Sequence, residues 1–200
     1  MIDMELFDYT VENLLKGFST TLQIGLFGIA LSLIVGMLLA LMRVSGNKLA
    51  VGFAFSYSTV FRGTPLLVQL FILYYGLGTL GFIRHTPALW WLFSDGTRCA
   101  ILAIALNSGA YIGEVFRGGF QSIPNGQIEA AKAMGMRPFK RFCRVSFPLA
   151  IRQALPAYSN EIILVIKGTS LASTIAVMDL TGHAKRLMNQ SYAIIETFMI

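Results

Sequence analysis

Two long stretches without a charged residue constrain this chain more than any other feature. Gly17 to Met42 and Gly63 to Ile83 contain no Asp, Glu, Lys or Arg. The hydrocarbon core of a bilayer is about 30 Å thick and a helix rises ~1.5 Å per residue, so roughly 20 apolar residues cross it. Each stretch is long enough, and the whole chain has only 13% charged residues, too few to cover the surface of a soluble domain. The sequence therefore predicts an all-α integral membrane protein.

The hydropathy pattern predicts a single transmembrane domain over residues 1–200 with five helices. The fifth is expected to be truncated, because the apolar run from Gln190 to Ile200 is too short to cross and no basic stop follows it. Gly28, Gly36 and Ala40 recur at helical spacings in the first helix and predict a close-packing face. The predicted helices cover about 17–42, 53–83, 97–117, 148–172 and 190 to the end.

Basic residues are concentrated between the third and fourth predicted helices. They outnumber the one carboxylate there, Glu129, so the positive-inside rule predicts that this loop is cytoplasmic and that the amino terminus lies outside. Because the net charge of +6 falls beside hydrophobic segments, it predicts contact with membrane lipid and not with nucleic acid. The cations of the loop are Arg117, Lys132, Arg137, Lys140, Arg141, Arg144 and Arg152.

This loop also contains a predicted short helix, at about 126–136, that lies outside the lipid. Ile128 to Met134 are good helix formers with an early carboxylate, and Gly135 followed by Pro138 predicts where the helix ends. The residues alone leave two interpretations open. The segment is either a docking surface for another protein or an amphipathic segment on the lipid headgroups.

The spacing of residues in and after this helix resembles the EAA loop of bacterial ATP-binding-cassette importer permeases. That pattern is E-A-A-x3-G-x9-I-x-L-P, and the chain departs from it only at two hydrophobic positions, Val145 and Phe147. The resemblance implies that the helix couples the permease to an ATPase subunit. The residues implied to contact that subunit are Glu129, Ala130, Ala131, Gly135, Arg137 and Phe139.

Four further blocks resemble the permeases for polar amino acids, within the histidine and arginine uptake group: Phe61 to Leu70, Leu106 to Tyr111, Pro156 to Glu161 and Lys167 to Leu171. The resemblance implies the permease fold in the bacterial inner membrane, with a periplasmic amino terminus. The implied partners are ATPase subunits, a second permease subunit that is identical or different, and a periplasmic amino-acid-binding protein. The chain contains no G-x-x-x-x-G-K-[ST] sequence, so we expect it to be non-catalytic, with ATP and magnesium used by the partner. We expect no bound cofactor and no metal site in this chain.

The predicted second helix is interrupted near its start by Gly63, Thr64 and Pro65. Proline has no backbone N–H to donate, so the carbonyl groups before it need other donors. The sequence therefore predicts that this end of the helix is buried in protein.

Polar residues within the predicted spans are candidates for the substrate path. Glu161 lies near the middle of the fourth helix, where a carboxylate could meet a cationic amino acid or serve a structural role. Asn107, Tyr111 and Glu114 share one stripe of the third helix and either bind substrate or hydrogen-bond to other helices. Weaker candidates are Gln69, Tyr158 and Asn160.

Two other functions are compatible with a membrane protein of this kind. An ion-coupled secondary transporter would use Glu161 and Glu114 to bind protons or sodium, but such carriers usually show two related halves, and no internal repeat is visible here. A membrane sensor or scaffold would leave the broken second helix and Glu161 without a role. The sequence favours the ATP-driven importer and does not specify which amino acid it carries.

Overall fold

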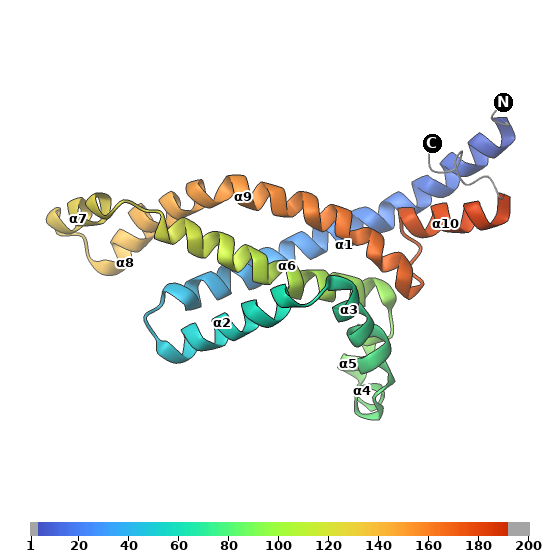
Figure 1. Ribbon diagram of the computed structural model, residues 1–200, viewed down its shortest axis with the longest axis horizontal. Helices are drawn as coiled ribbons and strands as arrows, with labels where there is room; N and C mark the ends of the chain where they lie inside the picture. The colour runs from blue at the N-terminus through green and yellow to red at the C-terminus, as the bar shows by residue number, and fades with distance from the viewer. Residues whose placement is uncertain (1–3, 192–200) are drawn as a thin grey trace. The chain divides into compact units, whose positions relative to one another are not determined.

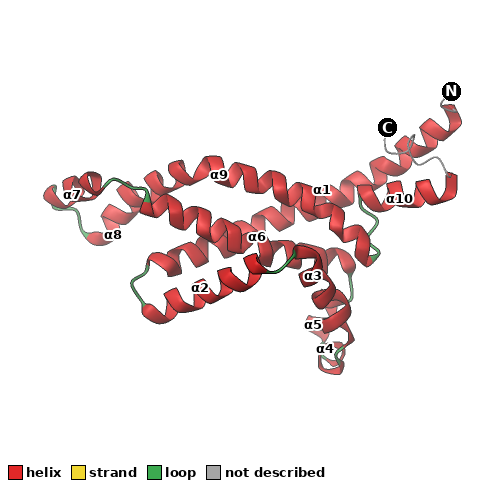
Figure 2. Cartoon of the chain, viewed as in Figure 1, coloured by secondary structure: helices red, strands yellow, loops and turns green. Residues whose placement is uncertain are grey.

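The computed structural model describes the backbone of residues 4–191 and the side chains of residues 11–190, and Figure 1 labels the helices used below. Every regular element within residues 4–191 is helical, as Figure 2 shows, which confirms the all-α prediction. Two helices are long and apolar enough to cross a membrane, and the number rises to four if each of two bent pairs is one span.

The first helix, α1 (Met4–Val44), is longer than the predicted 17–42. Its extension contains Glu12 and Lys16, whose side chains form an ion pair of 2.9 Å one helical turn apart. The charge-free criterion excludes these residues, although an i,i+4 pair of this kind supports a helix. The apolar run therefore marks only part of α1.

The region predicted as one helix over 53–83 is divided into several elements. The first, α2 (Lys48–Gly63), begins after Asn47, whose side chain accepts hydrogen bonds from the backbone N–H groups of Leu49 and Ala50. It ends at Thr64, before Pro65, as the Gly-Thr-Pro sequence predicts. The elements that follow are α3 (Leu66–Phe71), the π-helical turn η1 (Ile72–Gly76), the 3-10 turn η2 (Leu77–Thr79), α4 (Gly81–His85) and α5 (Pro87–Phe93).

The second half of the chain contains two long helices separated by short ones. The predicted helices 97–117 and 148–172 fall on α6 and on α9 with the 3-10 segment after it. Most of the predicted helix from 190 to the end lies outside the described residues. The elements are α6 (Gly96–Gln121), α7 (Asn125–Ala133), α8 (Pro138–Arg141), η3 (Phe142–Ser146), α9 (Phe147–Gly168), η4 (Thr169–Ile175) and α10 (Leu180–Ser191).

The chain divides into two compact units. Among the described residues, the first combines 4–29, 65–104 and 165–191. Its core is a continuous cluster of buried apolar side chains that includes Ile24 and Leu70. In the same unit α10 lies beside the amino-terminal part of α1 (Figure 1), where the Leu180 N–H donates a 3.0 Å hydrogen bond to Thr21 Oγ1.

The second unit combines Ala30–Thr64 and Ala105–Leu164. Here α1 and α6 approach closely through small residues. A Cβ atom added at Gly36 would lie closer than 3.0 Å to the Ile112 side chain, and one at Gly109 would lie 2.6 Å from Val35 Cγ1. The predicted packing role of Gly36 is therefore confirmed, and Gly109 extends it to the facing helix.

Candidate functional site

The first candidate region is the short helix α7 and the turn that ends it. Met134 closes the helix by donating its N–H to the Ala130 carbonyl at 3.0 Å, and Gly135 then adopts φ +71. The Met136 N–H returns to the Ala131 carbonyl at 3.2 Å. This is a glycine-dependent helix end, because a positive φ places the Cβ of other residues too close to the backbone.

The predicted ATPase-contact residues divide by exposure. Glu129, Ala130, Gly135 and Arg137 are exposed. Phe139 in α8 is 79% exposed. Met134, a neighbour that was not predicted as a contact residue, is 68% exposed. Ala131 is only 1% exposed, so it packs α7 against its own chain. Large apolar side chains beside polar ones are typical of a protein-binding surface.

The second candidate region lies in the second unit, where α2 breaks. The Phe61 carbonyl would normally accept from the N–H of residue 65, which is proline. It accepts instead from Asn107 Nδ2 at 3.0 Å, and the Arg62 carbonyl accepts from the Tyr111 hydroxyl at 3.3 Å. Two members of the predicted polar stripe therefore donate to carbonyl groups of the broken helix, as predicted. The prediction that this end of the helix is buried is wrong for this chain by itself, because residues 62–65 are exposed.

Glu161 lies near the same break. Its side chain is only 8% exposed, its carboxylate is hydrogen-bonded by the Ser108 side chain, and the charge of Arg62 acts on it. Arg62 is further held over the Tyr111 ring, 5.2 Å from its centroid. A carboxylate has lone pairs on two oxygens, so with these neighbours Glu161 retains the capacity to accept from a further donor.

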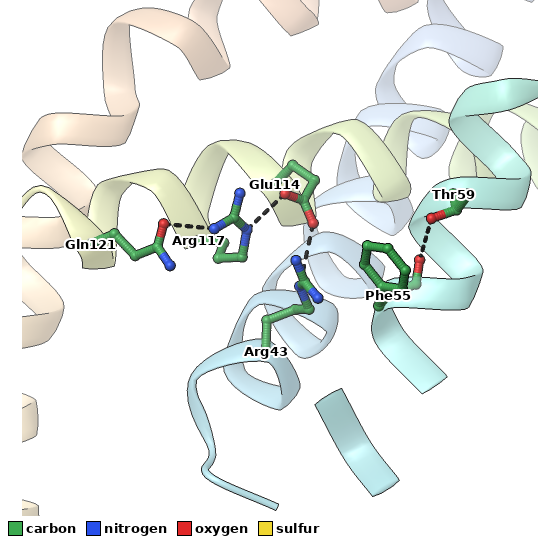
Figure 3. A network of polar contacts seen from close by, with 6 residues as sticks. All are labelled: Arg43, Phe55, Thr59, Glu114, Arg117 and Gln121. Atoms are coloured by element: carbon green, nitrogen blue, oxygen red, sulfur yellow. Dashed lines mark hydrogen bonds and ion pairs between the residues drawn. The ribbon is translucent and has the colours of Figure 1, made fainter. Parts of the chain in front are cut away.

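Glu114 forms a separate network with basic residues, drawn in Figure 3. Its carboxylate lies 3.4 Å from Arg43 Nε of α1 and 2.7 Å from Arg117 Nε of its own helix. Arg117 also donates to the Gln121 side chain at 2.6 Å, and the Arg43 guanidinium lies 5.1 Å from the centroid of the Phe55 ring. Glu114 thus connects α1 to α6 through ion pairs.

The weaker candidates lie in other surroundings. Tyr158 packs its ring 5.7 Å from that of Phe116 and contributes to an apolar groove of about 490 Å³. Asn160 is exposed, and Gln69 is buried within the first unit.

Several residues of the second region were not predicted from the sequence. Ser108 contacts Glu161, and the Tyr57 hydroxyl donates to the Leu106 carbonyl at 2.9 Å. In the sequence, Arg117 indicated only membrane orientation. One signal could have predicted that Arg43 and Arg117 pair with Glu114, because a carboxylate within an apolar helix requires a partner.

Comparison with known proteins supports the resemblance drawn from the EAA spacing. Residues 28–200 match the family described as binding-protein-dependent transport system inner membrane component. The chain is 44% identical over 199 residues to the nopaline transport system permease protein NocM of Agrobacterium fabrum, covering 100% of this chain and 83% of that protein. It is 50% identical over 189 residues to the octopine transport system permease protein OccM of Rhizobium radiobacter, covering 94% of this chain and 77% of that protein.

A third relative is the histidine/lysine/arginine/ornithine transport system permease protein HisM of Escherichia coli. It is 40% identical over 176 residues, covering 88% of this chain and 74% of that protein.

A solved structure supports the same assignment. The crystal structure of an amino acid ABC transporter with histidines matches with a TM-score of 0.84 and 31% identity, covering 100% of this chain and 88% of that chain. The inward-facing MetNI methionine ABC transporter matches with a TM-score of 0.64 at 20% identity, covering 99% of this chain and 94% of that chain. It shares the fold. The chain belongs to the binding-protein-dependent transport system inner membrane components, the permease subunits of ABC importers, in which separate subunits hydrolyse ATP.

Proposed function

We propose that this chain is the permease subunit of an ATP-driven importer for basic amino acids or closely related compounds. The family match and the relatives named for nopaline, octopine, arginine and histidine/lysine/arginine/ornithine transport support this class. The observation that carries the choice of cationic substrates is Glu161, a carboxylate buried to 8% exposure within α9. Besides the Ser108 hydroxyl and the charge of Arg62, a carboxylate can accept further donors, so it suits the cationic group of a ligand.

Glu161 is the proposed ligand for the cationic group of the substrate. Asn107 and Tyr111 act as positioning residues, because their side-chain donors are used by the carbonyl groups of Phe61 and Arg62. Glu114 maintains helix packing through its two ion pairs. The remaining proposed path residues are Gln69, Tyr158 and Asn160.

The helix α7 is the proposed coupling helix. Glu129, Ala130, Gly135, Arg137 and Phe139 would contact the ATPase subunit, with Ala131 supporting the helix from within. ATP and magnesium would bind to that subunit, and this chain would bind no cofactor. Closure of the ATPase subunits would then move α7 and the helices joined to it.

The proposed assembly is a five-helix transmembrane domain over residues 1–200 with its amino terminus in the periplasm. It would pair with a second permease subunit, bind two ATPase subunits in the cytoplasm and receive its substrate from a periplasmic binding protein.

The test is ATP turnover of the full-length permease co-purified with the ATPase and binding protein encoded beside it, in liposomes. We expect stimulation by arginine or histidine and none by glutamine. Glu161→Gln removes the charge at nearly constant shape, so it should reduce the stimulation at least tenfold. The control, Glu12→Gln, removes an exposed carboxylate paired with Lys16 and should leave stimulation unchanged. Failure to capture any ATPase would contradict the importer function, and full stimulation in Glu161→Gln would exclude Glu161 from the path.

A further inference from the structure

The proposed function assigns no ligand to a polar cavity in the second unit. It has a volume of about 410 Å³ and lies among the end of α1, α2 and the part of α6 that leads toward α7. The lining residues are Arg43, Phe55, Ser58, Thr59, Arg62, Gly63, Glu114 and Arg117.

The charges around this cavity do not balance. Three guanidinium groups line it, from Arg43, Arg62 and Arg117, against the single carboxylate of Glu114. Glu161 lies outside the lining and acts electrostatically on Arg62. Counting both carboxylates still leaves one guanidinium without an opposite charge among these residues. The Arg43 and Arg117 side chains are only 17% and 26% exposed, and an uncompensated charge that is largely removed from water is unfavourable, so the cavity favours an added anion.

One hydrogen-bond donor in the lining is also unsatisfied. Ser58 is only 4% exposed, yet its hydroxyl has no hydrogen-bond partner among the residues that the structure describes. Buried donors are nearly always paired in native proteins. Arg43 Nε forms an ion pair with Glu114 at 3.4 Å but no hydrogen bond within the same described part of the chain. A buried, unpaired hydroxyl in a cavity lined by guanidinium groups indicates an acceptor with negative charge.

We propose that this cavity binds an oxyanion, a carboxylate or phosphate group, held by the guanidinium groups and by the Ser58 hydroxyl. Guanidinium groups match the geometry of such oxygens through paired N–H donors. Two sources can supply this chemistry. One is the α-carboxylate of the transported amino acid, which would rest on the proposed function. The other is the phosphate of a lipid headgroup, which would not.

The experiment measures thermal unfolding of the permease purified with its partner subunits in detergent. Sodium acetate and sodium phosphate are compared with sodium chloride at equal ionic strength. We expect both oxyanions to raise the unfolding temperature of the natural protein. Ser58→Ala and Arg43→Gln should each remove at least half of that rise. The matched control is Ser159→Ala, whose hydroxyl already donates to the Leu155 carbonyl at 2.9 Å outside the cavity, and it should retain the full rise.

The proposal is overturned if neither oxyanion raises the unfolding temperature, or if Ser58→Ala retains the whole rise. Ser58→Ala removes an unpaired donor, so its unfolding temperature in chloride should match the natural protein and exclude a folding defect. The acetate comparison needs neither ATP nor a binding protein, so it remains informative if the transport proposal fails.

Two further arms distinguish the sources once the acetate effect is established. In the first arm, arginine is compared with argininamide, which lacks the carboxylate. If arginine alone raises the unfolding temperature, and Ser58→Ala abolishes that rise, the occupant is the carboxylate of the amino acid. In the second arm, the protein in phosphatidylglycerol nanodiscs is compared with the protein in uncharged detergent. If the nanodiscs raise the unfolding temperature, and Ser58→Ala abolishes that rise, the occupant is the lipid headgroup. Either result supports the oxyanion site. If the unfolding temperatures of the natural protein and of Ser58→Ala change equally, the proposal is overturned.

Discussion

The two compact units of this permease are stabilised by different kinds of interaction. The first has a broad core of buried apolar side chains, from Ile24 in α1 to Val177 before α10. The second has a smaller apolar cluster, around Ile112 and Phe116, and adds partly buried ion pairs and side-chain bonds to a broken helix. Close glycine contacts occur in both units, at Gly28 in the first and at Gly109 in the second. The difference indicates that apolar burial dominates the stability of the first unit, whereas specific polar contacts contribute more in the second.

The largest expected effect tests the first unit. Leu70 is 2% exposed in its core, so Leu70→Ala should leave a cavity and lower the free energy of unfolding by about 2–5 kcal/mol. Leu49→Ala is the control, because Leu49 is 85% exposed and should change stability little. Thermal unfolding in detergent measures both. Equal effects from the two variants would show that apolar burial does not govern this unit.

Close packing in the second unit is tested at Gly109. The Cβ of a larger residue there would meet Val35, so Gly109→Leu should cost about 1–3 kcal/mol by overpacking. Gly118 lies on the same helix with no neighbouring atom within 4 Å of an added Cβ, which makes Gly118→Leu the matched control. Equal tolerance of both substitutions in the same unfolding assay would show that close packing at Gly109 does not stabilise this unit.

The polar bonds of the second unit are tested at Asn107. Asn107→Leu keeps the branching of the side chain and removes the donor to the Phe61 carbonyl, which should cost about 0.6–2 kcal/mol, the range for hydrogen bonds between membrane helices. Amide hydrogen exchange near the break in α2 should increase along with the loss of stability. Unchanged exchange and stability would mean that this bond contributes nothing to holding the broken helix.

The smallest stability effect is expected at the end of α7. Gly135→Ala places a Cβ at φ +71 and should cost about 1 kcal/mol locally, because left-handed backbone is unfavourable for other residues. Gly126→Ala, within the same helix and away from other atoms, should be neutral or slightly stabilising. ATP turnover stimulated by substrate should fall in the first variant alone. If substrate stimulates ATP turnover normally in Gly135→Ala, the end of α7 is not required for coupling to the ATPase subunit.

Much of the fold follows from the sequence because the bilayer imposes simple requirements. The first charge-free run indicated α1, whereas the second, Gly63 to Ile83, is divided among several short elements. Pro65 indicated both the end of α2 and the need for donors to its carbonyl groups. The short helix before Gly135 followed from local propensity and from a glycine whose positive φ the structure then shows.

The partners within the site could not be predicted from the sequence. Asn107 and Tyr111 were candidates for either substrate or helix contacts, and only the packing of α2 against α6 shows that they meet the Phe61 and Arg62 carbonyl groups. Ser108 and Arg43 face Glu161 and Glu114 across different helices. Local sequence patterns contain no information about such distances, so these pairings require the tertiary structure.

The hydrogen bond from Asn107 to the Phe61 carbonyl also predicts how residues 65 and 107 vary among related permeases. Pro65 and Asn107 are separated in sequence, yet the amide supplies the donor that the proline lacks. In a relative whose residue at position 65 is not proline, the main-chain N–H can close the helical bond to residue 61 and the amide is no longer required. The two positions should therefore change together in an alignment of such permeases, with proline and a side-chain donor gained or lost as a pair.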